Sequence, residues 1–373
     1  MADIDLVVTD EQRALGETLR EFFAEQAPLE RLHRPRGGEG FDRKTWAGVA
    51  ELGLPAMIVP EEHGGLGQTA NEAWVMFTEA GRGLYGGPLL AGVAATHALL
   101  LSGDDDACAT HLPGVADGST VATVAAAEAG SDGRWSAPAG GTTAERDGES
   151  WVLTGTKTLV LAGDAADLVL VAAATPEGPG LFAVTGDPEG LTRTELETLD
   201  LSRPLSRLHF DGVPARIVGA AGDGMRILEP TFDRLLVALA AEQAGGARAC
   251  LDLSVEYART RTQFDAPIGS FQAVAHLCVD MLARAERAEA ASHYAAAAQA
   301  VGDGEFPVAA RVAAGYCGRA FREVTTQTIH VHGGTGFTWE HDAHLFHRRA
   351  WSSEHLFGTA STHHAEVATR LGL

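Results

Sequence analysis

The sequence predicts an α+β fold in which a β domain lies between two helical domains, and three observations support this. Before about residue 119, apolar residues recur at helical spacing. From there to about residue 221, short β-prone runs alternate with clusters of Gly, Asp and Pro. Long alanine-rich helical runs then return. We therefore expect a helical N-terminal domain over residues 1–118, a middle β domain over residues 119–221 and a C-terminal helical bundle over residues 222–373.

The first domain is expected to begin with a helix. Thr9 and Gln12 have the spacing of a capping box, and Pro28 ends the helical periodicity that follows them. A second helix is expected around Trp46, and residues 52–67 read as a loop-rich turn. Two more helices are expected over residues 70–84 and 89–103.

In the middle domain, we expect strands in the β-prone runs. These runs are 121–127, 150–162, 167–173, 180–186 and 206–213. In the C-terminal domain, the helical runs are 225–261, 273–300 and 306–331, with a fourth helix near the C-terminus. Pro230 is typical of a helix start, so it favours a first-turn position for Asp233, where the helix dipole would lower the pKa of an aspartate.

Composition and net charge restrict the classes of function and partner that the chain can have. The chain has 373 residues with 45% hydrophobic and 21% charged residues, which is ordinary for a soluble globular protein, and no apolar run is long enough to span a membrane. A net charge of −22 repels nucleic acid and anionic membranes, so we expect neither as a partner. The acidic N-terminus is unlike a leader peptide, so a cytoplasmic location is expected. The spacing of the four cysteines predicts reduced, buried thiols and no metal site. They are Cys108, Cys250, Cys278 and Cys317.

Two segments of the C-terminal domain carry most of the information on function. The first is RTQFDAPIGSFQ, from Arg261 to Gln272, and the second is HVHGGTGFTWEHDAHLFHRRA, from His330 to Ala350. Together they resemble the C-terminal helical domain of the acyl-CoA dehydrogenases, which are flavoenzymes that desaturate acyl-CoA thioesters. The resemblance implies that family's fold: a helical N-domain, a central small β-barrel and a C-terminal four-helix bundle. It also implies FAD as the cofactor.

By this resemblance, Arg261 binds the flavin pyrophosphate of a neighbouring subunit, with Phe264 and Gln272 beside it. Arginine suits this role because its planar guanidinium can bond two phosphate oxygens at once. This chain has Asp265 where the family usually has glycine.

A second set of cofactor contacts is implied by the stretch that begins at His330, which corresponds to Gln-x-x-Gly-Gly in the family. There, Gly333 and Gly334 allow the backbone to approach the ADP moiety closely. Ser131, in the string Ala-Gly-Ser-Asp that ends at Asp132, matches part of the family's flavin-contacting segment.

The contacts to the flavin ring differ from those of the family. Residues 125–127 are all alanine where the family has polar residues. Leu159 and Leu161 replace the tryptophan and threonine of the family's Trp-x-Thr motif, which pack against the ring. The structural frame of the motif is kept, and the contacts to the ring are lost.

The position of the catalytic base also differs. Desaturation requires a base for the α-proton while hydride leaves the β-carbon for the flavin. The common position of this base is the glutamate of Tyr-Glu-Gly-Thr, and here that position is Phe357. Some members of the family carry the carboxylate on an earlier bundle helix, which makes Asp233 the candidate base. Glu354 is a second candidate, one turn out of register.

The resemblance therefore implies an FAD-dependent acyl-CoA dehydrogenase subunit that desaturates an acyl-CoA substrate and passes electrons to a separate acceptor. The pattern is most similar to the short subunits of actinobacterial-type enzymes that act on steroid side chains, in which two homologous chains form an α₂β₂ tetramer. A homotetramer that uses Asp233 is an alternative. A non-catalytic partner or scaffold subunit is another, and a flavin oxidase of the same fold is a third.

Overall fold

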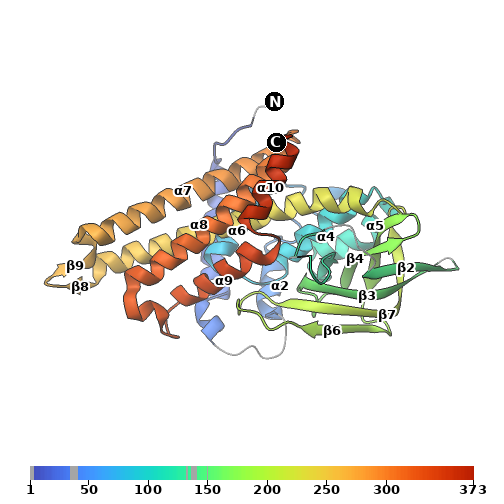
Figure 1. Cartoon of the computed structure of the whole chain (residues 1–373), viewed down its shortest axis with the longest axis horizontal. Coiled ribbons are helices and arrows are strands. Elements are labelled where there is room, and N and C mark those ends of the chain that lie inside the picture. The colour runs from blue at the N-terminus through green and yellow to red at the C-terminus, as the bar shows by residue number, and fades with distance from the viewer. Residues whose placement is uncertain (1–3, 34–40, 132, 136–140, 149) are drawn as a thin grey trace.

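A computed structural model confirms the α+β fold, with helices at both ends of the chain and a small β-barrel between them (Figure 1). It describes residues 4–33, 41–131, 133–135, 141–148 and 150–373. The barrel lies at one end of the molecule, and the long C-terminal helices extend away from it (Figure 1). The domain boundaries given above stay predictions.

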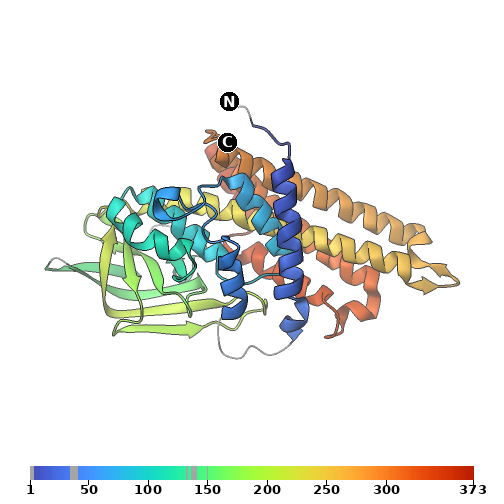
Figure 2. The same cartoon turned by 180° about the vertical axis from the view of Figure 1, so that it is seen from behind.

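The N-terminal part is helical as expected. The predicted capping box at Thr9 is present, with its hydroxyl accepting from the backbone of Gln12. α1 runs crosswise to the long helices (Figure 2). The sequence did not predict α5, although Asp104 caps it by accepting from the backbone of Ala107. The elements are α1 Asp10–Gln26, η1 Leu29–His33, α2 Arg43–Glu51, η2 Glu61–His63, α3 Ala70–Arg82, α4 Leu89–Ser102 and α5 Asp105–Ala116.

The middle part forms one seven-stranded sheet that closes into a barrel. The closure follows the order β4-β2-β3-β7-β5, with β5 pairing again with β4, while β1 joins β4 and β6 joins β7. The sequence predicted all of these strands except β2 and β6, whose side chains are largely exposed. The strands are β1 Ala122–Ala125, β2 Thr142–Asp147, β3 Ser150–Leu161, β4 Leu168–Thr175, β5 Gly178–Thr185, β6 Leu191–Glu195 and β7 Leu205–Val218.

The C-terminal part is built on the 37-residue helix α6. A short hairpin joins α6 to α7 at the end of the molecule farthest from the barrel (Figure 1). The elements are α6 Gly224–Thr260, β8 Thr262–Gln263, β9 Ala266–Pro267, η3 Ile268–Ser270, α7 Gln272–Ala300, α8 Phe306–His332, η4 Gly333–Phe337, α9 Ala343–Leu356 and α10 Ala360–Arg370.

The expected first-turn position of Asp233 is wrong. α6 begins at Gly224, so Pro230 lies inside the helix and Asp233 in its third turn. Ile227 and Leu228 are fully buried ahead of the proline. Their burial offsets the hydrogen bond that the proline removes, which costs about 3 kcal/mol. The helix dipole falls off within the first turn, so it does not lower the pKa of Asp233 as expected.

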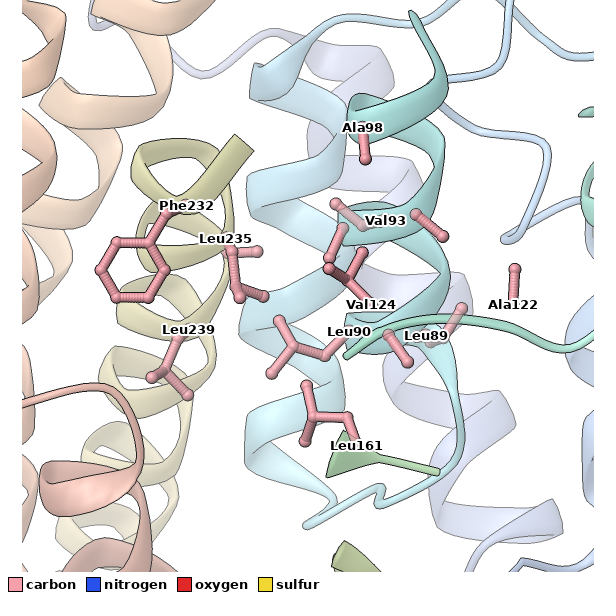
Figure 3. Close-up of a cluster of buried hydrophobic side chains, with 14 of the residues drawn as sticks. Leu89, Leu90, Val93, Ala98, Ala122, Val124, Leu161, Phe232, Leu235 and Leu239 are labelled. Atoms are coloured by element: carbon pink, nitrogen blue, oxygen red, sulfur yellow. The ribbon is translucent and has the colours of Figure 1, made fainter. Parts of the chain in front are cut away.

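The core between the barrel and the helices is apolar. Side chains from α4, α6, β1 and β3 gather in one cluster that includes Leu90, Val124, Leu161 and Leu235 (Figure 3). None of the helices among the described residues is long and apolar enough to cross a membrane. All four cysteines are free thiols, and Cys278 is only half-buried, whereas the other three are buried.

Candidate functional site

The segments whose flavin-ring contacts are altered meet beside the start of α6. The backbone N–H of Thr158 donates to the carbonyl of Ala127 (3.0 Å), which joins the alanine stretch to the strand that carries Leu159. Gly133 lies against both Leu159 and Leu356, since a Cβ on it would be 3.5 Å from the Cδ1 of Leu159 and 1.9 Å from the carbonyl oxygen of Leu356. We call this region the ring side.

Three aromatic rings fill the ring side. Trp135, Phe232 and Phe357 lie with their centroids 5.4, 5.8 and 6.2 Å apart. Phe357 is only 2% exposed, so the position that carries the base in the family is part of an apolar core. The Arg311 guanidinium lies 4.8 Å from the centre of the Phe232 ring and covers it. The space next to Phe357 is therefore occupied by side chains of this chain.

Asp233 adjoins this cluster and is held by two arginines. Its carboxylate is buried and accepts from Nε of Arg311 at 2.8 Å and from a terminal nitrogen of Arg370 at 3.4 Å. Burial raises the pKa of Asp233, and the two guanidinium groups act in the opposite direction. Glu354, the second candidate, is paired with Arg322 at 2.5 Å. Both carboxylates therefore have cationic partners, and a catalytic role for either stays a prediction.

Sequence reasoning missed one charged residue on the ring side. Lys157 is fully buried, and its Nζ donates to the Glu128 carboxylate at 2.8 Å and to the carbonyl of Ala126 at 3.3 Å. Burial lowers the pKa of Lys157, while Glu128 opposes this shift. This ion pair fixes the alanine stretch against β3. A lysine in an otherwise apolar, β-prone run was the available signal.

The residues predicted to hold the ADP half of FAD lie on the surface at the other end of the bundle. They are Arg261, Phe264, Gln272, His330, Gly333 and Gly334, and all are exposed. Phe264 is 90% exposed at the tip of the hairpin. The ends of α6 and α8 are tied together by Tyr257 and His332, whose rings stack with centroids 4.3 Å apart. We call this region the ADP side.

The two glycines of the ADP side differ in what the fold requires. Gly333 has φ of +59°, a backbone conformation that favours glycine, and it ends α8. Gly334 has no positive φ, and a Cβ on it would have no atom within 4 Å. Within the described chain, nothing therefore requires glycine at position 334. The close approach of a ligand would supply that requirement.

The ring side and the ADP side lie far apart on this chain. Both lie along α6, with Asp233 in its third turn and Arg261 at its C-terminal end. At about 1.5 Å per residue, these two residues are roughly 40 Å apart along the helix. Ser131 lies on the ring side, half-buried, and its hydroxyl has no partner among the described residues. Asp132 lies outside the described residues.

The described residues fit the ADP half of FAD but not its flavin ring. On the ADP side, an unburied arginine and an open glycine backbone are suited to a pyrophosphate. On the ring side, the aromatic cluster and Leu159 occupy the space, and we find no fit for an isoalloxazine ring. No group of three or more His, Cys, Asp or Glu side chains in the described part of the chain could hold a metal ion.

Two family models match the chain. Residues 9–119 match the acyl-CoA dehydrogenase N-terminal domain, and residues 222–372 match the acyl-CoA dehydrogenase C-terminal domain. Among curated relatives, the chain is 30% identical to acyl-CoA dehydrogenase IpdE2 of Mycobacterium tuberculosis over 93% of each protein. It is 38% identical to acyl-CoA dehydrogenase FadE34 of the same organism over 83% of this chain, but it spans only 39% of that longer protein.

Solved structures are also similar to this chain over nearly its whole length. The Tcur3481–Tcur3483 steroid acyl-CoA dehydrogenase variant has a TM-score of 0.86 and 31% identity, covering 98% of this chain and 99% of that one. The ChsE4–ChsE5 complex from Mycobacterium tuberculosis has a TM-score of 0.88 and 27% identity, covering 99% of each chain. The second of these structures is a complex of two named proteins.

Proposed function

Because this chain belongs to the acyl-CoA dehydrogenase family, we propose that it is a half-site subunit of a heteromeric acyl-CoA dehydrogenase. In this proposal it contributes the ADP-side residues to an FAD whose flavin ring lies in a homologous partner chain. The partner supplies the base and the pocket for the acyl group.

One observation carries this proposal: the ring side is filled by the chain's own side chains, while the ADP side is exposed about 40 Å away along α6. A single FAD bound with its ring beside Phe357 is therefore out of reach of the Arg261 of the same chain. A second chain resolves this geometry, because it can bring its own ring side to this chain's Arg261.

On the ADP side, Arg261 would bond the pyrophosphate oxygens, with Phe264 and Gln272 beside it. Gly333 and Gly334 would let the backbone N–H groups approach the ADP moiety, and His330 would offer a hydrogen bond to it. When bound, FAD supplies the acceptor for the substrate's β-hydride. The similarity to a steroid acyl-CoA dehydrogenase favours a bulky acyl-CoA as substrate. The similarity to the ChsE4–ChsE5 complex favours an α₂β₂ assembly. An external electron acceptor completes the turnover.

The competing proposal is a self-sufficient enzyme that uses Asp233 as its base. The raised pKa of this buried carboxylate favours it, because a base with a pKa nearer neutrality takes a proton more readily. Its ion pair with Arg311 opposes it, since that pair holds the carboxylate in its charged form and occupies one of its oxygens.

The flavin content of the chain distinguishes the two proposals. We expect the chain purified alone to be colourless, and the complex co-expressed with a homologous subunit to carry about one FAD for each pair of chains. Arg261→Ala should strip the flavin from that complex, whereas Arg259→Ala, which changes an exposed arginine two residues away, should not. A yellow protein without a partner would overturn the half-site proposal. So would loss of turnover in an Asp233→Asn variant that keeps its flavin and its melting temperature.

A further inference from the structure

The loop that carries Gly333 and Gly334 is packed against a group of imidazoles. We define the histidine cluster as His33, His332, His341 and His344, with Trp339 and Asp342 among them. The rings of His332 and His341 are 4.5 Å apart, and those of His33 and His344 are 5.8 Å apart. His33 comes from η1 of the N-terminal part, so the cluster also fastens this loop to a distant segment of the chain.

Hydrogen bonds fix which ring nitrogens carry protons. His332 donates from Nδ1 to the carbonyl of Thr328 at 2.8 Å, and its Nε2 is buried without a partner among the described residues. His344 donates from Nε2 to the carbonyl of Trp339 at 3.2 Å, and its buried Nδ1 likewise has no partner in the described part of the chain. A second proton on either ring would create a buried N–H without an acceptor, which costs about 1–3 kcal/mol.

His341 responds to protonation differently. Its Nδ1 accepts from the backbone N–H of Ala343 at 3.1 Å, at the first residue of α9. A proton on Nδ1 would break this bond and release the start of α9. The loop between Gly333 and α9 would thus lose one of its fixed ends.

The charges around the cluster give little compensation for added protons. Asp342 is the carboxylate in contact, and it already accepts from Nε2 of His33 at 2.8 Å. Arg348 lies over the Trp339 ring and adds a positive charge next to His344. Tyr257 of α6 stacks on His332 and carries no charge. Protonated imidazoles at these distances would repel one another and Arg348.

We propose that the histidine cluster positions the Gly333–Gly334 loop, and that protonation of the cluster releases the loop and weakens its hold on the cofactor's ADP half. The first part rests on the described contacts. The second rests on the function proposed above.

The direction of the pH effect follows from the buried imidazoles. Burial lowers the pKa of His332, His341 and His344 below the ordinary value of about 6.5. The opened loop therefore binds more protons than the closed loop at acidic pH, and the closed loop loses stability as pH falls below about 6.5. Each such imidazole favours opening by up to about tenfold between pH 7.5 and pH 5.5.

Hydrogen exchange of the chain alone tests the first part without any flavin. After correction for the intrinsic exchange rate, amides in residues 333–342 should exchange faster at pH 5.5 than at pH 7.5, by up to about tenfold for each imidazole that the opening releases. His332→Gln, His341→Gln and His344→Gln should each reduce this response, whereas the matched control His276→Gln, at an exposed position on α7, should keep it. Exchange that does not change with pH, or single variants that all keep the full response, would overturn the inference.

Flavin release from the co-expressed complex tests the second part. The complex should lose FAD faster at pH 5.5 than at pH 7.5, and His344→Gln should slow this loss. If exchange responds to pH while flavin release does not, the link to the cofactor is wrong and the positioning of the loop stands. If the complex binds flavin independently of Arg261, the proposed function fails, and the exchange experiment still decides on the loop.

Discussion

Asp265 occupies a position in the α6–α7 hairpin that suits glycine better than aspartate. Its φ is +60°, and that of its neighbour Phe264 is +53°. Left-handed conformations cost a residue with a Cβ about 1 kcal/mol, and aspartate tolerates them better than most. The strain lies at the exposed tip that we propose to meet a partner's cofactor, and the Asp265 carboxylate would also repel a pyrophosphate there.

We expect Asp265→Gly to stabilise the chain by about 0.5–1 kcal/mol, because glycine adopts this φ without strain. Asp265→Ala serves as the control, since it removes the same charge but keeps the Cβ. Urea unfolding of both variants measures the effect. Equal stability of the two variants would show that the backbone conformation costs nothing here.

Single residues also show where sequence reasoning succeeds and where it fails. The capping box of Thr9 and Gln12 was predicted correctly because both partners lie within one turn. The first-turn placement of Asp233 was wrong because the helix continues ahead of Pro230, where burial that depends on tertiary packing offsets the cost of the proline. Lys157 was missed for the same reason, since its partner Glu128 lies on a different segment of the chain.

At the scale of elements, α3 and α6 approach closely through glycines on both helices. A Cβ on Gly81 of α3 would lie 2.0 Å from the carbonyl oxygen of Glu242. A Cβ on Gly245 of α6 would lie 1.9 Å from the carbonyl oxygen of Thr78. Each helix therefore packs directly on the backbone of the other, and this contact fixes how α6 sits in the fold.

We expect Gly245→Ala to destabilise the chain by about 1–3 kcal/mol, because a backbone carbonyl cannot move aside cheaply. Gly92→Ala is the matched control. Gly92 also lies inside a helix, α4, but a Cβ on it would have no atom within 4 Å. That variant should gain up to about 1 kcal/mol from helix propensity. Thermal unfolding of both variants measures the difference, and a loss of stability in both would refute the role of the close approach.

Elements were predicted best where their pattern was strong. The long alanine-rich helices and the buried strands were found, because their periodicity extends over many residues. β2 and β6 were missed because their mostly polar, exposed residues show no apolar alternation. The convergence of Trp135, Phe232 and Phe357 could not be predicted from spacing, because the three rings come from separate parts of the chain.

At the scale of the whole molecule, a buried ion-pair network joins all three parts of the chain. Arg349 of α9 donates to Asp200 of the β domain at 2.6 Å and to Glu242 of α6 at 2.8 Å. Glu242 also accepts from Arg203. The carbonyl of Leu84, in the N-terminal part, accepts from Arg349 at 3.5 Å. Two arginines and two carboxylates therefore balance each other in the interior.

We expect Arg349→Met to cost about 3–5 kcal/mol, because it leaves two buried carboxylates with a single arginine. The unfolding transition should also broaden or split, since the contact between the three parts is weakened. Arg348→Met is the control, at the neighbouring and more exposed position. Differential scanning calorimetry measures both effects. A single sharp transition at the original temperature would contradict this role of Arg349.

The length of α6 has a consequence for the choice of partner. Since the helix is continuous from Phe232 to Thr260, it sets the distance between this chain's ring side and Arg261, which directly follows the helix. A shift of one turn, about 5.4 Å, would move Arg261 away from a pyrophosphate while leaving the fold intact. In the half-site assembly proposed above, compatibility between two chains would therefore depend on matched helix lengths as well as matched surfaces. In that assembly, a homologue whose bundle is longer or shorter by a turn would not place its flavin site against Arg261.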